Sequence, residues 1–443
     1  NSGQGTISTS SQPSVDSAIG AGAMALSRPD GKYLIIKGGA TGTTSVYDPL
    51  ANTFTSSQTI VCNGTTTVGV GALALPRADG KYTLICGVAG STTTATSIVD
   101  PMGTVASVIG PALNTNAVTA GGTVAFKRPD GKYLVTVPGG VTTQIYDPAA
   151  TSTNFVLGPP ATGLGNFGVG SLAIPRPDGT ALIVSGGAAS TTAIYSPFAG
   201  SATIGSFILA PGSGAGPNLD GVKTAGTCGI NGAGSVAMKR QDGKYVIMSK
   251  ANVSALYDPS ANTMTCRTTS EIASLSNAIV LGDGAHAIPL QNGKFMVFTG
   301  GANASSSYVY NQDTDTFSAT SAGATPLATT TGAFSLMRTD GTWQTITGAN
   351  TCSTGCTFNL NTSLPMSDPF PAAAVAATPT SGGSCGAGLH SYFVTFVTNG
   401  VESELGQKSN IVACTAGNGT VALSGIPLGA VPGTTARKIY RTT

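Results

Sequence analysis

Charged side chains are scarce in this sequence of 443 residues. Asp, Glu, Lys and Arg make up only 9% of it, against roughly 25% in an average soluble domain. The 21 basic and 19 acidic residues leave a formal net charge of +2. Proteins that bind nucleic acids or anionic membranes rely on clustered positive charge. The composition therefore argues against nucleic acid and against an anionic membrane surface as partners.

Long apolar runs and histidines are also lacking. Although 41% of the residues are hydrophobic, no apolar run approaches the roughly 20 residues that a membrane-spanning helix needs. The sequence has two histidines and contains neither a phosphate-binding P-loop nor a dinucleotide-binding glycine fingerprint. We therefore expect no membrane span and no cofactor. The hydrophobic content and regular periodicity also differ from those of a disordered chain.

The eight cysteines fall into near-neighbour pairs: Cys62 with Cys86, Cys228 with Cys266, Cys352 with Cys356, and Cys385 with Cys414. Such pairing is typical of disulfides formed in an oxidising compartment. Cys352 and Cys356 also have the spacing of half a zinc site. No second Cys or His pair accompanies them, which favours a loop closed by a disulfide. The sequence thus predicts an extracellular or surface-exposed protein.

Two further features agree with this location. Sequons at Asn63, Asn252, Asn303, Asn361 and Asn418 permit glycosylation without demonstrating it. The chain starts at Asn1 rather than Met, from which we expect a processed form or a fragment.

A repeat dominates the sequence. An Arg-x-Asp-Gly turn, or Leu-Gln-Asn-Gly in the sixth copy, recurs seven times. Each is followed by an aromatic or apolar strand, in six copies by a turn that contains Gly, and then by Tyr-Asp-Pro or a degraded copy of it. The turns lie at Asp30, Asp79, Asp130, Asp178, Asp242, Asn292 and Asp340, with spacings of 49, 51, 48, 64, 50 and 48 residues. A period near 50 with four short strand patterns predicts one four-stranded antiparallel sheet per repeat, which is the blade of a β-propeller.

Glycines support a closed ring of seven blades. Alignment of the repeats places glycine at one first-strand position in all seven: Gly22, Gly71, Gly122, Gly170, Gly234, Gly284 and Gly332. A recurrent glycine in a strand marks a close approach of backbones, as expected where wedge-shaped blades converge on an axis. The predicted fold is therefore all-β, a seven-bladed propeller followed by a small C-terminal β-sandwich.

The repeat resembles the kelch repeat over about residues 5–365, through its Gly-Gly pair, the strand to Tyr-Asp-Pro and a following Asn-Thr-Phe, as in Asn52–Phe54. The resemblance implies a kelch-like propeller over residues 1–368. Gly5–Gln12 mirrors Asn52–Gln58, so we expect the N-terminus to supply the outer strand of the last blade, with Asn359–Leu364 as a competing donor.

The last residues, 369–443, differ. A linker at Ala372–Gly383 precedes alternating strands at Ser391–Val397 and Thr420–Leu423 and a final segment at Arg437–Arg441. These stretches resemble the fibronectin type III or Ig-like modules of phage-tail and bacterial surface proteins. Such modules carry one or two further strands, so the sandwich is expected to be incomplete. Either the gene product is longer, or strand addition from another subunit completes the sheet.

Candidate chemical sites are few, and the repeat explains most of them. His286 aligns with Met24, Leu73, Val124, Leu172, Val236 and Phe334, which favours a packed, hydrogen-bonded histidine over a catalytic base. Asn311, Asp313 and Asp315 have the spacing of a calcium loop, but they align with the Tyr-Asp-Pro turn and lack a later bidentate Glu. His390 has no evident Ser or Asp partner. Copper oxidases of kelch type need several imidazole and tyrosine ligands, which one propeller histidine cannot supply.

We therefore expect no catalytic, cofactor-binding or metal-binding residues and no enzymatic activity. The expected function is that of an extracellular structural protein, the self-assembling subunit of a surface filament joined through its C-terminal module. The alternative is an adhesin or phage-tail binding module that recognises glycans or peptides through propeller loops. The insertion at Ala210–Gly232 is the loop best placed for binding. The expected partners are copies of the same chain or a cell-surface glycan.

Overall fold

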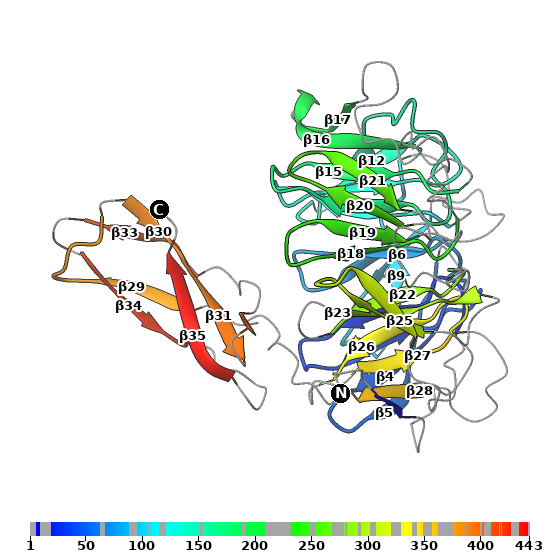
Figure 1. Cartoon of the computed structure of the whole chain (residues 1–443), viewed down its shortest axis with the longest axis horizontal. Coiled ribbons are helices and arrows are strands. Elements are labelled where there is room, and N and C mark those ends of the chain that lie inside the picture. Colours follow the sequence, from blue (N-terminus) through cyan, green and yellow to red (C-terminus); the bar gives the residue numbers. More distant parts are fainter. Residues whose placement is uncertain are drawn as a thin grey trace.

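Each repeat folds into one four-stranded antiparallel sheet in the computed structural model of the protein (Figure 1). The structure describes residues 6–8, 19–62, 67–87, 95–104, 107–114, 121–150, 154–187, 191–201, 203–208, 232–248, 254–267, 279, 281–290, 294–301, 307–319, 329–338, 343–348, 357–361, 375–386, 388–398, 401–402, 409–415, 417, 419–426 and 434–441.

Seven such sheets, here blades 1 to 7, are formed by the described part of the chain. The first four blades run from inner to outer strand in chain order. Blade 1 contains β2 (Met24–Ser27), β3 (Tyr33–Ile36), β4 (Thr43–Asp48) and β5 (Thr53–Thr59); blade 2, β6 (Leu73–Pro76), β7 (Tyr82–Ile85), β8 (Thr96–Val99) and β9 (Val108–Ile109); blade 3, β10 (Ala125–Lys127), β11 (Tyr133–Thr136), β12 (Thr143–Tyr146) and β13 (Phe155–Leu157); blade 4, β14 (Leu172–Pro175), β15 (Ala181–Val184), β16 (Thr192–Ser201) and β17 (Gly205–Ile208).

Blades 5 and 6 repeat this order, and blade 7 takes its outer strand from the N-terminus. Blade 5 contains β18 (Val236–Lys239), β19 (Tyr245–Met248), β20 (Ser254–Asp258) and β21 (Thr263–Arg267); blade 6, β22 (His286–Pro289), β23 (Lys294–Phe298), β24 (Ser307–Asn311) and β25 (Thr316–Ala319); blade 7, β26 (Phe334–Met337), β27 (Trp343–Ile346), β28 (Thr357–Asn361) and β1 (Thr6–Ser8). The predicted all-β propeller with four-stranded antiparallel blades is confirmed.

The N-terminal strand joins the two ends of the repeat array. Strand β1 lies antiparallel to β28, with Ile7 opposite Leu360. This confirms the predicted N-terminal closure. The competing segment at Asn359–Leu364 contributes to β28, which is the third strand of blade 7, so it does not form the outer strand.

The recurrent glycines lie where neighbouring blades come closest. Gly22 has φ +81°, and a Cβ built on it would be 2.0 Å from the carbonyl oxygen of Gly69 in blade 2. A Cβ on Gly332 would be 2.2 Å from the oxygen of Gly20, so blade 7 abuts blade 1 in the same way. The predicted close approach is confirmed, but its placement inside a strand was wrong. The glycines lie in the turn before each inner strand. All seven have a positive φ, a turn conformation that residues with a Cβ avoid.

The hydrophobic core is divided among the interfaces between blades. One cluster joins Leu182 and Val184 of blade 4 to Tyr257 of blade 5, and another joins Ile346 of blade 7 to Tyr47 of blade 1. The tyrosine of the third strand is fully buried in five blades: Tyr47, Tyr146, Tyr195, Tyr257 and Tyr310. Each of these residues anchors its blade against the preceding one, as the T-shaped packing of Tyr195 on Phe126 illustrates.

Disulfides link parts of the chain that the sequence paired. Cys62, after β5 of blade 1, is bonded to Cys86 at the end of β7 in blade 2, and Cys385 is bonded to Cys414. Cys266 is also disulfide-bonded. Its predicted partner Cys228 and the predicted pair Cys352 and Cys356 lie outside the described residues.

The C-terminal strands form three small sheets, drawn apart from the blades in Figure 1. Strand β29 (Ala376–Thr380) pairs with β34 (Thr420–Ser424), β30 (Gly388–His390) pairs with β33 (Val412–Cys414), and β31 (Tyr392–Thr398) lies between β32 (Val401–Glu402) and β35 (Thr434–Arg441). One hydrophobic cluster connects Val394 and Phe396 of β31 with Ala377 and Val412.

This arrangement corrects two expectations. The described strands do not form a clear two-sheet sandwich, because the ladders are short and divided among three sheets. Part of the predicted linker at Ala372–Gly383 is strand β29, held by its ladder to β34 and by the burial of Ala377. No helix in the described chain is long and apolar enough to cross a membrane.

Substitution of Gly234 by alanine tests the contact between blades. We expect Gly234→Ala to reduce the free energy of unfolding by clearly more than Gly243→Ala, as measured by urea denaturation. Both residues lie in the blade 5 repeat with φ of +84° and +81°, but a Cβ at Gly234 would meet the oxygen of Gly282 at 2.1 Å, whereas nothing lies within 4 Å of one at Gly243. The positive φ alone costs about 1–2 kcal/mol. Equal losses in the two variants would contradict the close approach.

Candidate functional site

An arginine two residues before the Asp of the repeated turn binds across to the next blade. Arg128, whose side chain is 1% exposed, pairs with Asp130 at 2.8 Å. Its Nη1 donates to the Tyr195 hydroxyl at 2.9 Å and to the Thr203 carbonyl at 3.1 Å, both in blade 4. We call this contact the arginine clasp. It recurs from Arg28 to Pro101, from Arg176 to Pro259, from Arg240 to Tyr310 and from Arg338 to Pro49.

The clasps give the Asp-Gly turns a structural role, as the sequence predicted. The role of the arginines was missed, although their fixed position in the repeat was a signal that could have shown it. The last clasp runs from blade 7 to blade 1, so it reinforces the closure made by β1.

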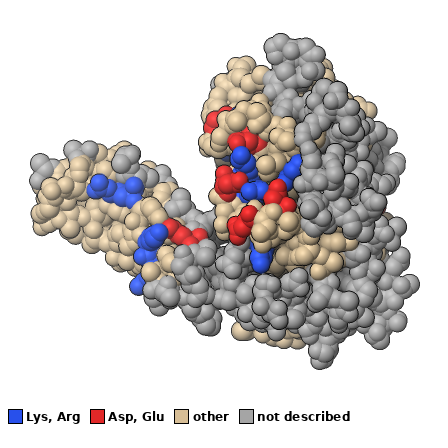
Figure 2. All heavy atoms as spheres, in the orientation of Figure 1, with Lys and Arg blue, Asp and Glu red and all other residues tan. Residues whose placement is uncertain are grey.

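A second set of ion pairs joins the Asp-Gly hairpin to the Tyr-Asp-Pro turn within a blade. Lys32 pairs with Asp48 at 2.8 Å and Lys132 with Asp147 at 3.1 Å. The hydrogen bond from Lys32, with those from the backbone of the turn, lowers the pKa of Asp48. Positive and negative side chains are accordingly interspersed over the blades (Figure 2). The described face in that view carries no field of one sign that would attract a polyanion or polycation.

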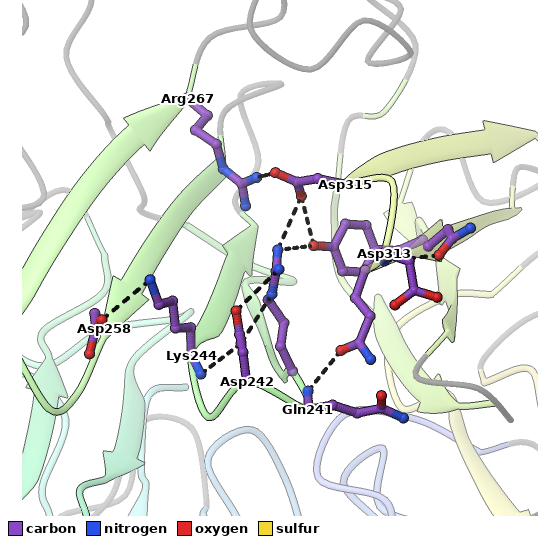
Figure 3. Close-up of polar contacts among 11 residues, drawn as sticks. Gln241, Asp242, Lys244, Asp258, Arg267, Asp313 and Asp315 are labelled. Carbon is purple, nitrogen blue, oxygen red and sulfur yellow. Dashed lines mark hydrogen bonds and ion pairs between the residues drawn. The ribbon is translucent and has the colours of Figure 1, made fainter. Parts of the chain in front are cut away.

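A polar group of four residues joins blades 5 and 6: Arg240, Arg267, Tyr310 and Asp315, here called the junction cluster (Figure 3). The Tyr310 hydroxyl donates to Asp315 Oδ1 at 2.7 Å, and Arg240 Nη1 lies 3.5 Å from the same oxygen. Arg267 donates from Nη1 to Asp315 Oδ2. Arg240 and Arg267 lie just after β18 and at the end of β21, while Asp315 lies in the turn before β25.

Asp315 takes the position that Asn52 and Asn262 hold in other blades. All three have a positive φ, between 51° and 54°. The tyrosine hydroxyl of the same blade donates to each of them, as from Tyr47 to Asn52 at 3.0 Å. The predicted turn at Asn311–Asp315 is therefore confirmed, and Asn311 Oδ1 accepts from the Asp313 backbone as in an Asx turn. With two arginines on Asp315, this turn does not fit a calcium loop.

The charges of the junction cluster explain why an acid replaces asparagine there. Burial raises the pKa of Asp315, but the hydrogen bond from Tyr310 and the two guanidinium groups outweigh it and lower the pKa below its ordinary value. Arg267 is 7% exposed, and its Nε and Nη2 are buried without a hydrogen-bond partner. Asp315 is thus the main compensation for a buried cation, which is a structural role.

His286 is hydrogen-bonded, as the sequence predicted, and its partners were not foreseen. Nδ1 lies 3.0 Å from the Gly284 carbonyl, and Nε2 lies 2.8 Å from Ser335 Oγ in blade 7. The ring stacks on Phe298 with centroids 4.7 Å apart. Burial lowers the pKa of His286 to about 4, so the imidazole is neutral at ordinary pH. Serine at 335 carried no motif that would have marked it in isolation.

His390 is buried in the C-terminal strands, with Nε2 2.7 Å from the Gly386 carbonyl. The insertion at Ala210–Gly232 lies outside the described residues except for Gly232. In the described ranges no group of three or more His, Cys, Asp or Glu could hold a metal ion.

Comparisons with known proteins support the propeller and no particular activity. No protein-family model matches the sequence, and no curated protein matches it. A fungal alcohol oxidase of the AA5 family, solved in complex with copper, shares 14% identity and a TM-score of 0.54 over 95% of this chain and 92% of that chain. At this identity the similarity concerns the fold alone.

Two lyases are less similar. A streptogramin B lyase has 11% identity and a TM-score of 0.48 over 78% of this chain and 94% of its own. A selenomethionine-substituted virginiamycin B lyase from Staphylococcus aureus has 11% identity and a TM-score of 0.49 over 76% and 94%.

The copper of the fungal oxidase does not fit the residues present here. Protein copper sites use several imidazole, thiolate or tyrosine ligands around one metal. The sequence has two histidines. Nδ1 of His286 and Nε2 of His390 contact backbone carbonyls, and Nε2 of His286 contacts Ser335. The described cysteines are in disulfides. We assign no copper centre and derive no chemistry through one.

The junction cluster yields a stability test. We expect Asp315→Asn to lower the free energy of unfolding by about 2 kcal/mol, less than the 3–5 kcal/mol of a fully buried pair, because the Asp315 side chain is 38% exposed. The turn and the Tyr310 bond can persist, since asparagine serves in blades 1 and 5. The measurement is urea unfolding of Asp315→Asn, of Arg267→Ser and of the double variant. The double variant should lose less free energy of unfolding than the sum of the two single losses, because the two residues interact.

The pH dependence provides the matching control. A carboxyl group whose pKa is lowered in the folded state stabilises the fold at pH values above its ordinary pKa of 3.8. This stabilisation is lost as the pH falls through the pKa of the folded state. The stability difference between the wild type and Asp315→Asn should therefore shrink on acidification. A difference that stayed constant into strong acid would contradict the charge argument.

Proposed function

We propose that the protein is an extracellular structural subunit that assembles with copies of itself through its C-terminal strands. The observation that carries this proposal is the exposure of β35. This strand pairs with β31 along one side, from Tyr392 opposite Arg441 to Thr398 opposite Thr434. It is the last strand in its sheet, so within the described residues its other edge has no partner.

Both faces of β35 are exposed as well. All residues from Ala436 to Arg441 are exposed, including Ile439 at 44% and Tyr440 at 41%. A strand with an open edge, whose residues 436–441 are all exposed, is a template for pairing with another chain. Natural proteins protect such edges with charge, especially lysine.

That protection is partly cancelled here. Lys438 pairs with Glu402 at 2.6 Å, and the Tyr440 hydroxyl donates to the same carboxyl. The hydrogen bond from Lys438 is the largest cause of the lowered pKa of Glu402, which falls to about 2. The carboxylate therefore stays charged opposite Lys438. A neutralised lysine repels an approaching strand less than a free one does.

A second copy of this chain is the proposed occupant of the edge. A net charge of +2 over 443 residues gives weak repulsion between identical subunits. Disulfides are typical of proteins outside the cell. Blades tied by glycine contacts and arginine clasps would provide a stiff body, while an extended segment of the neighbour would add a strand to β35.

The proposal extends to the fold family of each part of the chain. We propose a kelch-like propeller, which the Gly-Gly turns and the buried tyrosine of the third strand support. For the C-terminal strands we propose a fibronectin type III or Ig-like module, supported by the shared cluster of β29, β31 and β33.

A second candidate function is that of an adhesin that binds through one end of the propeller. The residue after the proline of the Tyr-Asp-Pro motif is apolar and exposed in three blades: Leu50 at 81%, Met102 at 46% and Phe198 at 64%. Exposed apolar groups that recur at one end of a rigid scaffold are suited to a ligand. The equivalents Ala149 and Ser260 show that the repeat does not need them.

Substitution of Ile439 by lysine tests the proposed assembly. We expect purified wild type to form oligomers or fibres in sedimentation and negative-stain electron microscopy, and Ile439→Lys to remain monomeric, because an added charge blocks edge pairing. The matched control is Leu389→Lys, which changes a side chain 68% exposed on β30. Wild type that stays dispersed and binds a glycan array would overturn the proposal in favour of the adhesin.

A further inference from the structure

A chain of three polar side chains lies at the interface between blades 6 and 7. His286 begins β22 and reaches Ser335 on β26, with Nε2 and Oγ 2.8 Å apart. Ser335 Oγ is in turn 2.8 Å from Thr345 Oγ on β27. We call these three residues the inner triad, after the inner strands that carry two of them.

The repeat shows that the scaffold does not require this triad. Six of the seven repeats have an apolar residue where His286 stands, alanine where Ser335 stands, and a Val, Leu or Ile where Thr345 stands. The alanines are Ala25, Ala74, Ala125, Ala173, Ala237 and Ala287, and the aliphatic residues are Ile35, Leu84, Val135, Ile183, Ile247 and Val297. Three adjoining polar replacements at one interface, in a place where polar groups cost stability, point to a function beyond packing.

The hydrogen bonds fix the direction of proton transfer. A carbonyl oxygen can only accept, so the contact with Gly284 places the imidazole proton on Nδ1. Nε2 then bears the lone pair and accepts the Ser335 hydroxyl proton, while Thr345 donates to Ser335 Oγ. A nucleophile bonded to a base that a third group orients is the general arrangement of an activated serine. The low pKa of His286 keeps the base unprotonated above about pH 5.

The triad lies beside an open sheet edge. Strands β22 and β26 are the first in their sheets, and inner strands of neighbouring blades contact one another, as β18 and β22 do. His286 and Ser335 are both half-buried. Further round the ring, a recess of about 340 Å³ lies between β2 and β6.

A backbone donor also lies next to the nucleophile. In blade 3 the Thr136 amide bonds to the Val124 carbonyl, and these residues correspond to Ile346 and Phe334 in blade 7. Hydrogen-bonded and non-bonded pairs alternate in antiparallel ladders. The next pair, Ser335 with Thr345, is therefore non-bonded, and the Ser335 N–H points to the open edge, where it can donate to an oxyanion.

We propose that Ser335 is a nucleophile activated by His286 and that the inner triad cleaves small carboxylic esters. Ser335 Oγ attacks the ester carbonyl carbon while its proton passes to His286 Nε2. The carbon–oxygen bond to the alcohol then breaks, and the departing oxygen takes that proton. Water attacks the resulting acyl-serine with His286 as base, releasing the carboxylic acid and restoring the hydroxyl. This activity is separate from the proposed assembly through β35.

Covalent labelling with a fluorophosphonate probe tests the proposal on the full chain. We expect one label per folded molecule, which mass spectrometry places on Ser335, and release of p-nitrophenol from its acetate ester. Ser335→Ala should abolish both. His286→Phe should reduce labelling by on the order of 10²-fold or more, the usual contribution of a general base. Both variants should fold, because alanine and phenylalanine stand at equivalent positions in other blades.

The controls separate a built site from chance reactivity. Ser260→Ala, in an exposed turn, should label like wild type, and urea-unfolded wild type should not label. Labelling should rise with pH to a plateau by about pH 5–6, reflecting the low pKa of His286. A purely structural triad predicts no labelling of folded wild type at any pH. That result, or labelling that persists in Ser335→Ala, would overturn the proposal.

Discussion

The contact between a carbonyl oxygen and a glycine of the adjacent blade is the constraint on which this structure depends. At Gly22, Gly170, Gly234, Gly284 and Gly332 the space that a Cβ would occupy is taken by backbone of the next inner turn. That approach sets how closely the inner strands converge and hence the wedge shape of each blade. It also requires a positive φ, so glycine meets two requirements at one position.

Outward from this contact, each interface is held by a different kind of interaction. Apolar clusters and buried tyrosines fill the middle of the wedge, and arginine clasps bind the turns at one end. The clasps suit a chain with few charges. The four guanidinium groups of Arg28, Arg128, Arg176 and Arg240 each pair with the Asp of their own turn and bond to the next blade at once. Charge that is used in this way leaves no single-sign field on the described face, which agrees with the low net charge.

Much of the fold could be predicted because the sequence contains seven copies of the same four-stranded repeat, which can be compared with one another. The blade strands, the N-terminal closure and two of the disulfides followed from periodicity and spacing. The arginine clasps were missed because their acceptors lie in the next blade, as with Arg28 and Pro101, which are 73 residues apart. Strand β29 was missed because its Ala, Thr and Pro residues have the composition of a linker, and only the ladder to β34 orders them.

The inner triad shows why alignment of repeats must be read over several positions at once. Compared only with its own equivalents, His286 is one polar residue at an apolar position, and a satisfied core histidine accounts for it. Ser335 and Thr345 are equally unremarkable when each is taken alone. The three replacements become informative together, because the ring brings consecutive repeats face to face and places His286 against a serine 49 residues later. In a propeller the natural unit of comparison is therefore the interface between two blades, since that is where both the core and any departure from it are built.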